Sequence, residues 1–215
     1  MIKQQYAAEF IGTFALVFCG TGAMVINDLY QGVIGHFGIS FTFGAIVMAM
    51  IYTFGDISGA HINPAVTFSF WLSGKFKGQM ILPYVLSQTL GAIMASLALL
   101  LLFPAHQDLG MTKPATGVFQ TFILEIILSY ILMLTIIHVA SGSKEKGIMA
   151  GMAIGLVVLL EATFAGPVSG ASMNPARSLA PALVSGNLQH LWVYLLAPLT
   201  GMTLSIVTWR LIKTP

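Results

Sequence analysis

The chain has 215 residues, of which 57% are hydrophobic and only 7% are charged, and its mean hydropathy is +0.89. Soluble domains carry about a quarter charged residues, so this composition excludes a water-soluble globular protein and favours one that lies in a lipid bilayer. The net charge of +2, without a basic run, argues against nucleic-acid binding, and the single cysteine excludes an intrachain disulfide.

Long apolar runs recur along the whole chain. A membrane-spanning helix needs about 20 mostly apolar residues, and the first run predicts such a helix and not a cleaved signal peptide. The predicted spans are 6–27, 37–55, 79–103, 116–140, 148–166 and 190–212.

Two further apolar stretches, 63–72 and 174–185, are too short to cross, and each begins with Asn-Pro-Ala. Asparagine is a strong N-cap and proline is favoured in the first helical turn, so each motif predicts the start of a helix. One copy alone indicates no more than that, but two copies in a membrane protein indicate re-entrant half-helices that enter from opposite faces and meet at the asparagines. The motif residues are Asn63, Pro64, Ala65, Asn174, Pro175 and Ala176.

The two halves of the chain repeat the same features in the same order. SGAHINPA at 58–65 corresponds to SGASMNPA at 169–176, and in the same way Glu9 corresponds to Glu125. Because each half holds three spans, an odd number, the second half is inserted upside down, with its broken helix near the midplane. We therefore expect a single transmembrane channel domain over 1–215, built from inverted repeats at about 1–105 and 114–215.

The cations predict the orientation of the bundle. If the spans alternate in direction, only Lys113 falls in a loop on one side, whereas most of the other cations fall together on the opposite side. Lysine and arginine concentrate in cytoplasmic loops, so both termini are expected to face the cytoplasm. The cations on that side are Lys3, Lys75, Lys77, Lys144, Lys146, Arg210 and Lys213.

The segments just before each asparagine cannot continue a helix, and every unsatisfied backbone group in hydrocarbon costs several kcal/mol. They are tolerable only beside water, so they predict a hydrated path lined by carbonyl groups. The expected lining residues are Gly59, Ala60, His61, Ile62, Gly170, Ser172 and Met173.

Two carboxylates in the spans occupy matching positions. We expect Glu9 and Glu125 to accept hydrogen bonds from N–H groups of the two loops and so hold them open. A proton relay is the alternative, because buried carboxylates often mark pumps, but the symmetry of the pair favours a supporting role. Glu161 has no counterpart in the first half.

The repeats differ just after the motif, where Val66 corresponds to Arg177. An arginine in a span costs about 2.5–3.5 kcal/mol on the most lenient scale, so its side chain must face water or a polar partner. A snorkelling arginine is the alternative. It is disfavoured because 178–186 carries no other charge, and we expect Arg177 to face a pore, donate to permeating oxygens and repel cations.

The segments SGAHINPAV and SGASMNPARS, with AEFIGTF and LEIILSY, resemble the major intrinsic proteins (aquaporins and glycerol facilitators) over nearly the whole chain. The resemblance implies an all-α, aquaporin-like right-handed bundle of six transmembrane helices plus two re-entrant half-helices. It also implies a homotetramer with one pore per protomer, and the short loops suit the inner membrane of a prokaryotic cell. No catalytic triad, nucleotide loop or metal-ligand spacing is present in the sequence, so we expect no enzyme activity, cofactor or metal.

The family's outer constriction, located by spacing from each asparagine, falls on Phe43, Ala162, the carbonyl of Ala171, and Arg177. Strict water channels have histidine at the position of Ala162, and glycerol facilitators have aspartate at that of Ser178. The stretch AGPVSGASMNPARSLAPAL is most similar to nodulin-like intrinsic proteins and their bacterial relatives. We expect a passive channel for water and small uncharged solutes (glycerol, urea, metalloid hydroxides) that excludes ions and protons. The alternatives are a water-selective aquaporin and, from another class, an ion-coupled secondary transporter.

Overall fold

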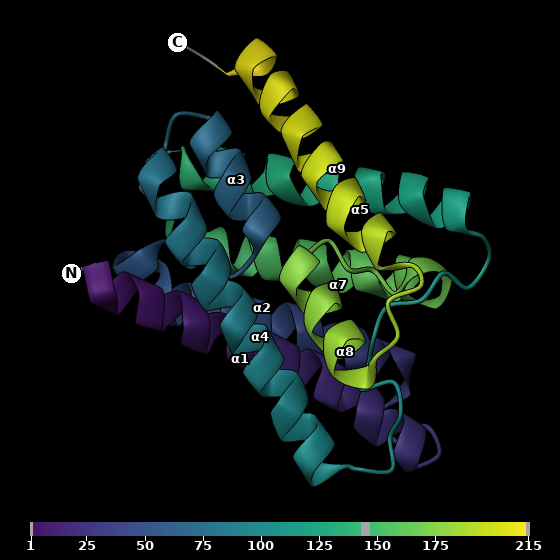
Figure 1. Ribbon diagram of the computed structural model, residues 1–215. Helices are drawn as coiled ribbons and strands as arrows, with labels where there is room; N and C mark the ends of the chain where they lie inside the picture. The colour runs from purple at the N-terminus through teal and green to yellow at the C-terminus, as the bar shows by residue number, and fades with distance from the viewer. Residues whose placement is uncertain (1, 143–146, 214–215) are drawn as a thin grey trace.

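The protein was analysed as a computed structural model that describes residues 2–142 and 147–213, and this part of the chain forms helices joined by loops, without a strand (Figure 1). Six of its helices are long and apolar enough to cross a membrane, as predicted. They are α1 (Ile2–Leu29), α2 (Gly35–Ser58), α4 (Ile81–Leu102, after the short 3-10 turn η1, Gly78–Met80), α5 (Val118–Ala140), α7 (Ala150–Ser169) and α9 (Leu191–Ile212). Lys144 and Lys146, used in the charge argument, lie outside the described residues.

Two short helices, α3 (Pro64–Leu72) and α8 (Pro175–Ser185), complete the fold. At a rise of 1.5 Å per residue their 9 and 11 residues extend about 14 and 17 Å, roughly half of a hydrocarbon core of about 30 Å. Each packs on helices of both halves, α3 on α4 and α9, and α8 on α9 and α4 (Figure 1). The half-helices therefore join the two repeats at the centre of the bundle.

Close backbone contacts hold the long helices together in matching pairs, α1 with α4 and α5 with α9. A Cβ atom at Gly91 would lie 2.2 Å from the carbonyl oxygen of Phe10, and one at Gly201 would lie 2.1 Å from that of Ile126. No larger residue fits at either position, which is how small residues let membrane helices approach. A glycine that allows close helix contact thus occurs at matching positions in the two halves, as expected of an inverted repeat.

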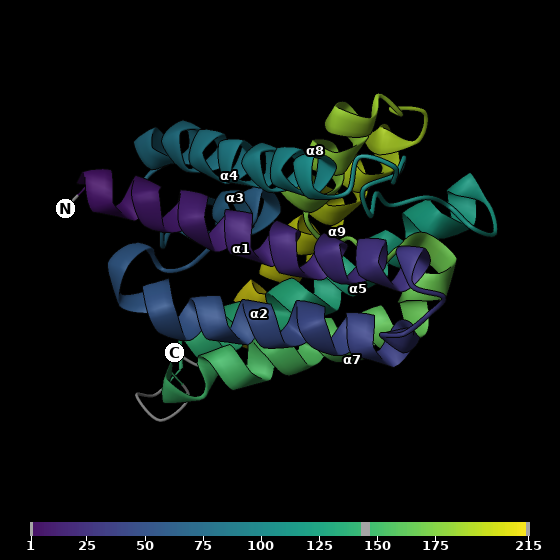
Figure 2. The same cartoon turned by 90° about the horizontal axis from the view of Figure 1, so that it is seen from below.

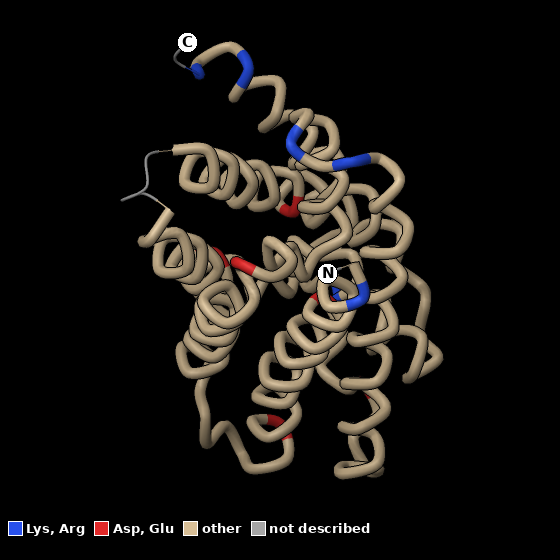
Figure 3. Tube along the Cα trace, turned by 90° about the vertical axis from the view of Figure 1, so that its left-hand side faces the viewer, with Lys and Arg blue, Asp and Glu red and all other residues tan. Residues whose placement is uncertain are grey.

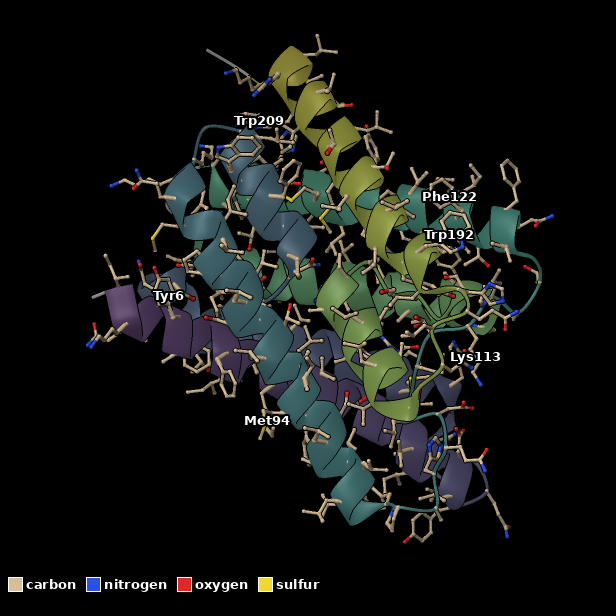
Figure 4. All side chains as sticks on the ribbon, viewed as in Figure 1. Tyr6, Met94, Lys113, Phe122, Trp192 and Trp209 are labelled. Atoms are coloured by element: carbon tan, nitrogen blue, oxygen red, sulfur yellow. The ribbon has the colours of Figure 1, made fainter. Side chains whose placement is uncertain are left out.

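The outer surface of the bundle suits a lipid environment. Large apolar side chains such as Leu101 (83% exposed) and Phe119 (72%) point outward, and the charged residues gather mainly at the ends of helices (Figure 3). Trp192, in contact with Phe122, and Trp209 lie near opposite ends of α9 (Figure 4), where aromatic side chains meet the two membrane interfaces. The start of α1 and the end of α9 lie at the same end of the bundle (Figure 2).

Candidate functional site: a central pore

The two half-helices begin in the same way. Asn63 and Asn174 have extended backbones, and each is followed by proline in the first helical turn. The side-chain oxygen of Asn63 accepts from the N–H of Ala65 at 2.9 Å, and that of Asn174 from the N–H of Ala176 at 3.0 Å. Each asparagine is thus an N-cap that leaves its amide nitrogen free to point away from its own helix.

The tips of α3 and α8 meet through these amide nitrogens. Nδ2 of Asn63 donates to the carbonyl of Met173 at 2.8 Å, and Nδ2 of Asn174 donates to the carbonyl of Ile62 at 2.9 Å. An amide nitrogen carries two hydrogens, so each asparagine has one N–H left over. Both asparagines line the central cavity, which places the remaining donors beside it.

The segments before the asparagines have an unusual backbone. Ala60 and Ile62 in the first loop, and Ala171 and Met173 in the second, have φ between 42° and 52°. Residues with side chains adopt this left-handed conformation only at a cost of about 1–3 kcal/mol each, and they keep it where surrounding contacts impose it. The two loops therefore need specific support.

Glu9 supplies that support to the first loop. Its carboxylate accepts from the N–H groups of His61 at 2.9 Å and Ile62 at 2.7 Å. The hydroxyl of Ser58 and the side-chain amide of Gln88 donate to the same carboxylate, both at 2.7 Å. Sequence reasoning had not singled out Gln88, because nothing in its local pattern distinguishes it from any other polar residue in a span.

Glu125 does the same for the second loop. It is fully buried, and it accepts from the N–H groups of Ser172 and Met173, both at 2.9 Å, and from the hydroxyl of Ser169 at 2.7 Å. The hydroxyl of Tyr194 donates to the carbonyl of Ser169 at 2.7 Å. The bonds from Ser169, Ser172 and Met173 repeat those that Ser58, His61 and Ile62 make to Glu9, whereas the bond from Gln88 has no counterpart among the described residues.

A cavity of about 1080 Å³ runs past both loops. It extends from Asp56 and Lys75 to Arg177, and it passes the two asparagines on the way. The predicted loop residues that line it are Gly59, Ala60, His61, Ile62, Ala171, Ser172 and Met173. Gly170 does not line it, contrary to expectation. It follows α7 in a left-handed conformation, where a Cβ would lie 3.0 Å from Thr112, which does not line the cavity either.

Four residues at one end of the cavity are those expected at the constriction, and all of them line it: Phe43, Ala162, Ala171 and Arg177. The guanidinium carbon of Arg177 lies 5.0 Å from the centre of the Phe43 ring, within the range of a cation–π contact. The ring in turn packs on Gly20, where a Cβ would lie 2.2 Å from it. Ala162 adds only a methyl group, so it leaves room.

Arg177 is 1% exposed and is held by groups that sequence reasoning did not find. Its Nη1 donates to the carbonyl of Gly110 at 2.8 Å, and its Nη2 lies 3.3 Å from the sulfur of Met24. Its Nε has no hydrogen-bond partner among the described residues. Gly110 belongs to the connection between the two repeats, and no sequence signal links that connection to an arginine 67 residues later.

Glu161 differs from the other two carboxylates in the spans. It is 4% exposed, and neither of its oxygens has a hydrogen-bond partner among the described residues. It does not line the cavity, although its neighbour Ala162 does. The contacts of the described residues therefore give Glu161 no part in holding the loops.

Comparison with known proteins gives consistent matches. The model of the family described as Major intrinsic protein matches residues 1–209. The Putative aquaporin NIP4-1 of Arabidopsis thaliana is 43% identical over 213 residues, which cover 99% of this chain and 75% of that protein. Nodulin-26 of Glycine max is 40% identical over 98% of this chain and 78% of its own length. The X-ray structure of the aquaglyceroporin from Plasmodium falciparum superposes with a TM-score of 0.89 at 25% identity, covering 99% and 97% of the two chains.

Proposed function

Because this chain belongs to the major intrinsic protein family, we infer that it is a passive membrane channel for water and small uncharged solutes, and not an enzyme. The observation that carries this inference is the cavity that passes both Asn63 and Asn174 and reaches Arg177. Passive flux needs such a path and no moving part. An ion-coupled transporter would instead use Glu9 or Glu125 to carry protons, but both are fully buried and engaged by the loop N–H groups that they support.

Electrostatics at the centre of the pore exclude ions and protons. The N-termini of α3 and α8 each carry about half a positive charge, and they meet at the tips of the two loops, where cations are repelled. The remaining N–H groups of Asn63 and Asn174 donate to a passing water molecule, so the oxygen of that water accepts from both. This interrupts the chain of hydrogen-bonded waters along which a proton would be transferred. Exclusion by half-helix dipoles and an arginine is established for aquaporin-type pores.

We propose that the constriction consists of Phe43, Ala162, the carbonyl of Ala171, and Arg177, and that it admits solutes larger than water. One aromatic ring and two alanines leave a wide opening, and a histidine at 162, as in strict water channels, would narrow it. Arg177 supplies donors and the loop carbonyls supply acceptors along one wall, which matches solutes that carry several hydroxyl or amide groups, such as glycerol, urea and arsenous acid.

Stopped-flow light scattering on proteoliposomes tests this proposal directly. Vesicles with the protein should shrink rapidly under an impermeant osmolyte and should then take up glycerol, urea and arsenous acid faster than empty vesicles. Rapid water flow without uptake of any of the three solutes would identify a water-selective aquaporin instead. Uptake that is driven uphill by a proton or sodium gradient would identify a transporter.

The family also supports finer proposals about assembly and orientation. We propose a homotetramer in the cell membrane, with a pore in each protomer and residues 1–215 acting as one channel unit of two inverted repeats. The cations Lys3, Lys75, Lys77, Arg210 and Lys213 support cytoplasmic termini under the positive-inside rule. Labelling of a cysteine introduced at position 3 or 113 by an impermeant reagent in whole cells distinguishes the two orientations.

A further inference from the structure

One of the helices that line the pore contains a proline in its last turn. Pro167 lies in α7 (Ala150–Ser169), and proline has no N–H to donate to the carbonyl four residues earlier. That carbonyl belongs to Thr163, the residue directly after the constriction residue Ala162. In a bilayer a freed carbonyl needs another donor, and a neighbouring helix commonly supplies it.

The replacement donor is His36, from the first turn of α2. Its Nε2 lies 2.6 Å from the carbonyl oxygen of Thr163. Because a carbonyl only accepts, the imidazole must carry a proton on Nε2. The ring also packs on Gly166, where a Cβ would lie 2.7 Å from its Cε1 atom, so a larger residue there would displace the histidine.

This contact joins the two helices that carry Phe43 and Ala162, α2 and α7. On the inner side of the constriction the same helices touch through their backbones, since a Cβ at Gly44 would lie 2.5 Å from the carbonyl oxygen of Gly155. On the outer side, the hydrogen bond from His36 to Thr163 lies two helical turns before Phe43. Phe43 and Ala162 therefore lie between a backbone contact and a hydrogen bond.

The inverted repeat has no second copy of this arrangement. The position that matches Pro167 in the first half is Asp56, which keeps its N–H, and the position that matches His36 in the second half is Gly147, which has no side chain. Of these two matching pairs of positions, the freed carbonyl and its donor thus occur in the pair at the end of the pore that holds the constriction and not in the other pair.

We propose that His36 is a positioning residue for the constriction. By donating to the carbonyl that Pro167 frees, it holds the outer ends of α2 and α7 at the separation that sets the size limit for solutes. The inference rests on the proposed channel function and adds to it a residue that does not line the pore.

The experiment measures the ratio of glycerol permeability to water permeability in proteoliposomes. His36→Leu removes the donor and should change this ratio by about two- to tenfold, towards glycerol, the range that corresponds to one net hydrogen bond. His36→Gln keeps an N–H donor at similar reach and should stay near the wild-type ratio. In the double variant His36→Leu with Pro167→Ala, the new N–H of residue 167 takes over the carbonyl, and the ratio should return towards wild type.

Tyr52→Phe is the matched control. The Tyr52 hydroxyl accepts from the N–H of Met152 at 3.2 Å and so also links α2 to α7 by one hydrogen bond, but at the opposite end of the pore. Tyr52 lines the cavity, but phenylalanine keeps its ring, so removal of the hydroxyl should leave the ratio unchanged. An unchanged ratio in His36→Leu, or a double variant that differs from wild type as much as the single one, overturns the inference. A wild-type protein that conducts neither water nor glycerol overturns the proposed function instead.

Discussion

Replacing Glu125 by glutamine tests how the second loop is held open. Oε1 of the carboxylate accepts from Ser169 and Ser172, and Oε2 accepts from Met173. Glutamine has the same shape but only one accepting oxygen. Whichever way its amide is placed, an N–H group of the loop faces an NH₂ group and is left buried without an acceptor.

The magnitude follows from these contacts. A hydrogen bond to a charged group contributes about 1.5–3 kcal/mol, and an ordinary one contributes about 1 kcal/mol. At least one of the three bonds is lost and the others lose their charge assistance, so we expect the free energy of unfolding to fall by about 2–4 kcal/mol. Because the carbonyl of Met173 accepts from Asn63, a shift of this residue also disturbs the contact between the half-helix tips, and water permeability should fall.

Thermal unfolding of the purified protein in detergent, followed by tryptophan fluorescence, measures the first effect, and stopped-flow scattering measures the second. Glu161→Gln is the matched control, because neither oxygen of Glu161 has a partner among the described residues. It should unfold and conduct like wild type. The reasoning is refuted if Glu125→Gln retains wild-type unfolding temperature and permeability, or if the two glutamine variants lose both to the same extent.

Four further substitutions test other parts of the pore. Ala162→His should keep water permeability and reduce glycerol uptake to that of empty vesicles, because an imidazole fills the space beside Arg177; unreduced uptake contradicts the assignment of Ala162 to the constriction. Arg177→Val, which installs the residue of the first repeat, should let monovalent cations through, as planar-bilayer current recordings would show. Tyr84→Phe and Tyr194→Phe each remove one matching bond to a loop carbonyl, so both should lower stability by a similar amount, about 0.5–1.5 kcal/mol; unequal losses in chemical unfolding would argue against equivalent loops.

Much of this fold can be predicted from the sequence because a bilayer leaves few choices. Every backbone group in hydrocarbon needs a hydrogen-bond partner, and a helix supplies nearly all of them within one segment, so an apolar run of sufficient length is a helix. The predicted spans agree with the six long helices to within a few residues. A boundary was missed mainly at the start of α1, which begins at Ile2 and not near residue 6, because a polar first turn can extend beyond the apolar core.

The internal repeat also allowed residues of the functional site to be predicted, and not only the helices. Asparagine and proline at matching positions specified where the two half-helices begin. Glutamate at matching positions specified which carboxylates lie near the loops before them. These residue types have local roles, as caps, helix starts and buried acceptors, that do not depend on what packs around them. Such roles can be inferred from a pattern alone.

The sequence by itself thus determined the class of protein, the number of helices and the position of the half-helices, since these follow from hydropathy, capping and symmetry. Only the tertiary structure decided which groups hold Arg177, Glu9 and Thr163 in place. Their partners, Gly110, Gln88 and His36, lie 67, 79 and 127 residues away along the chain. Such contacts depend on how whole helices pack, and no local pattern records them.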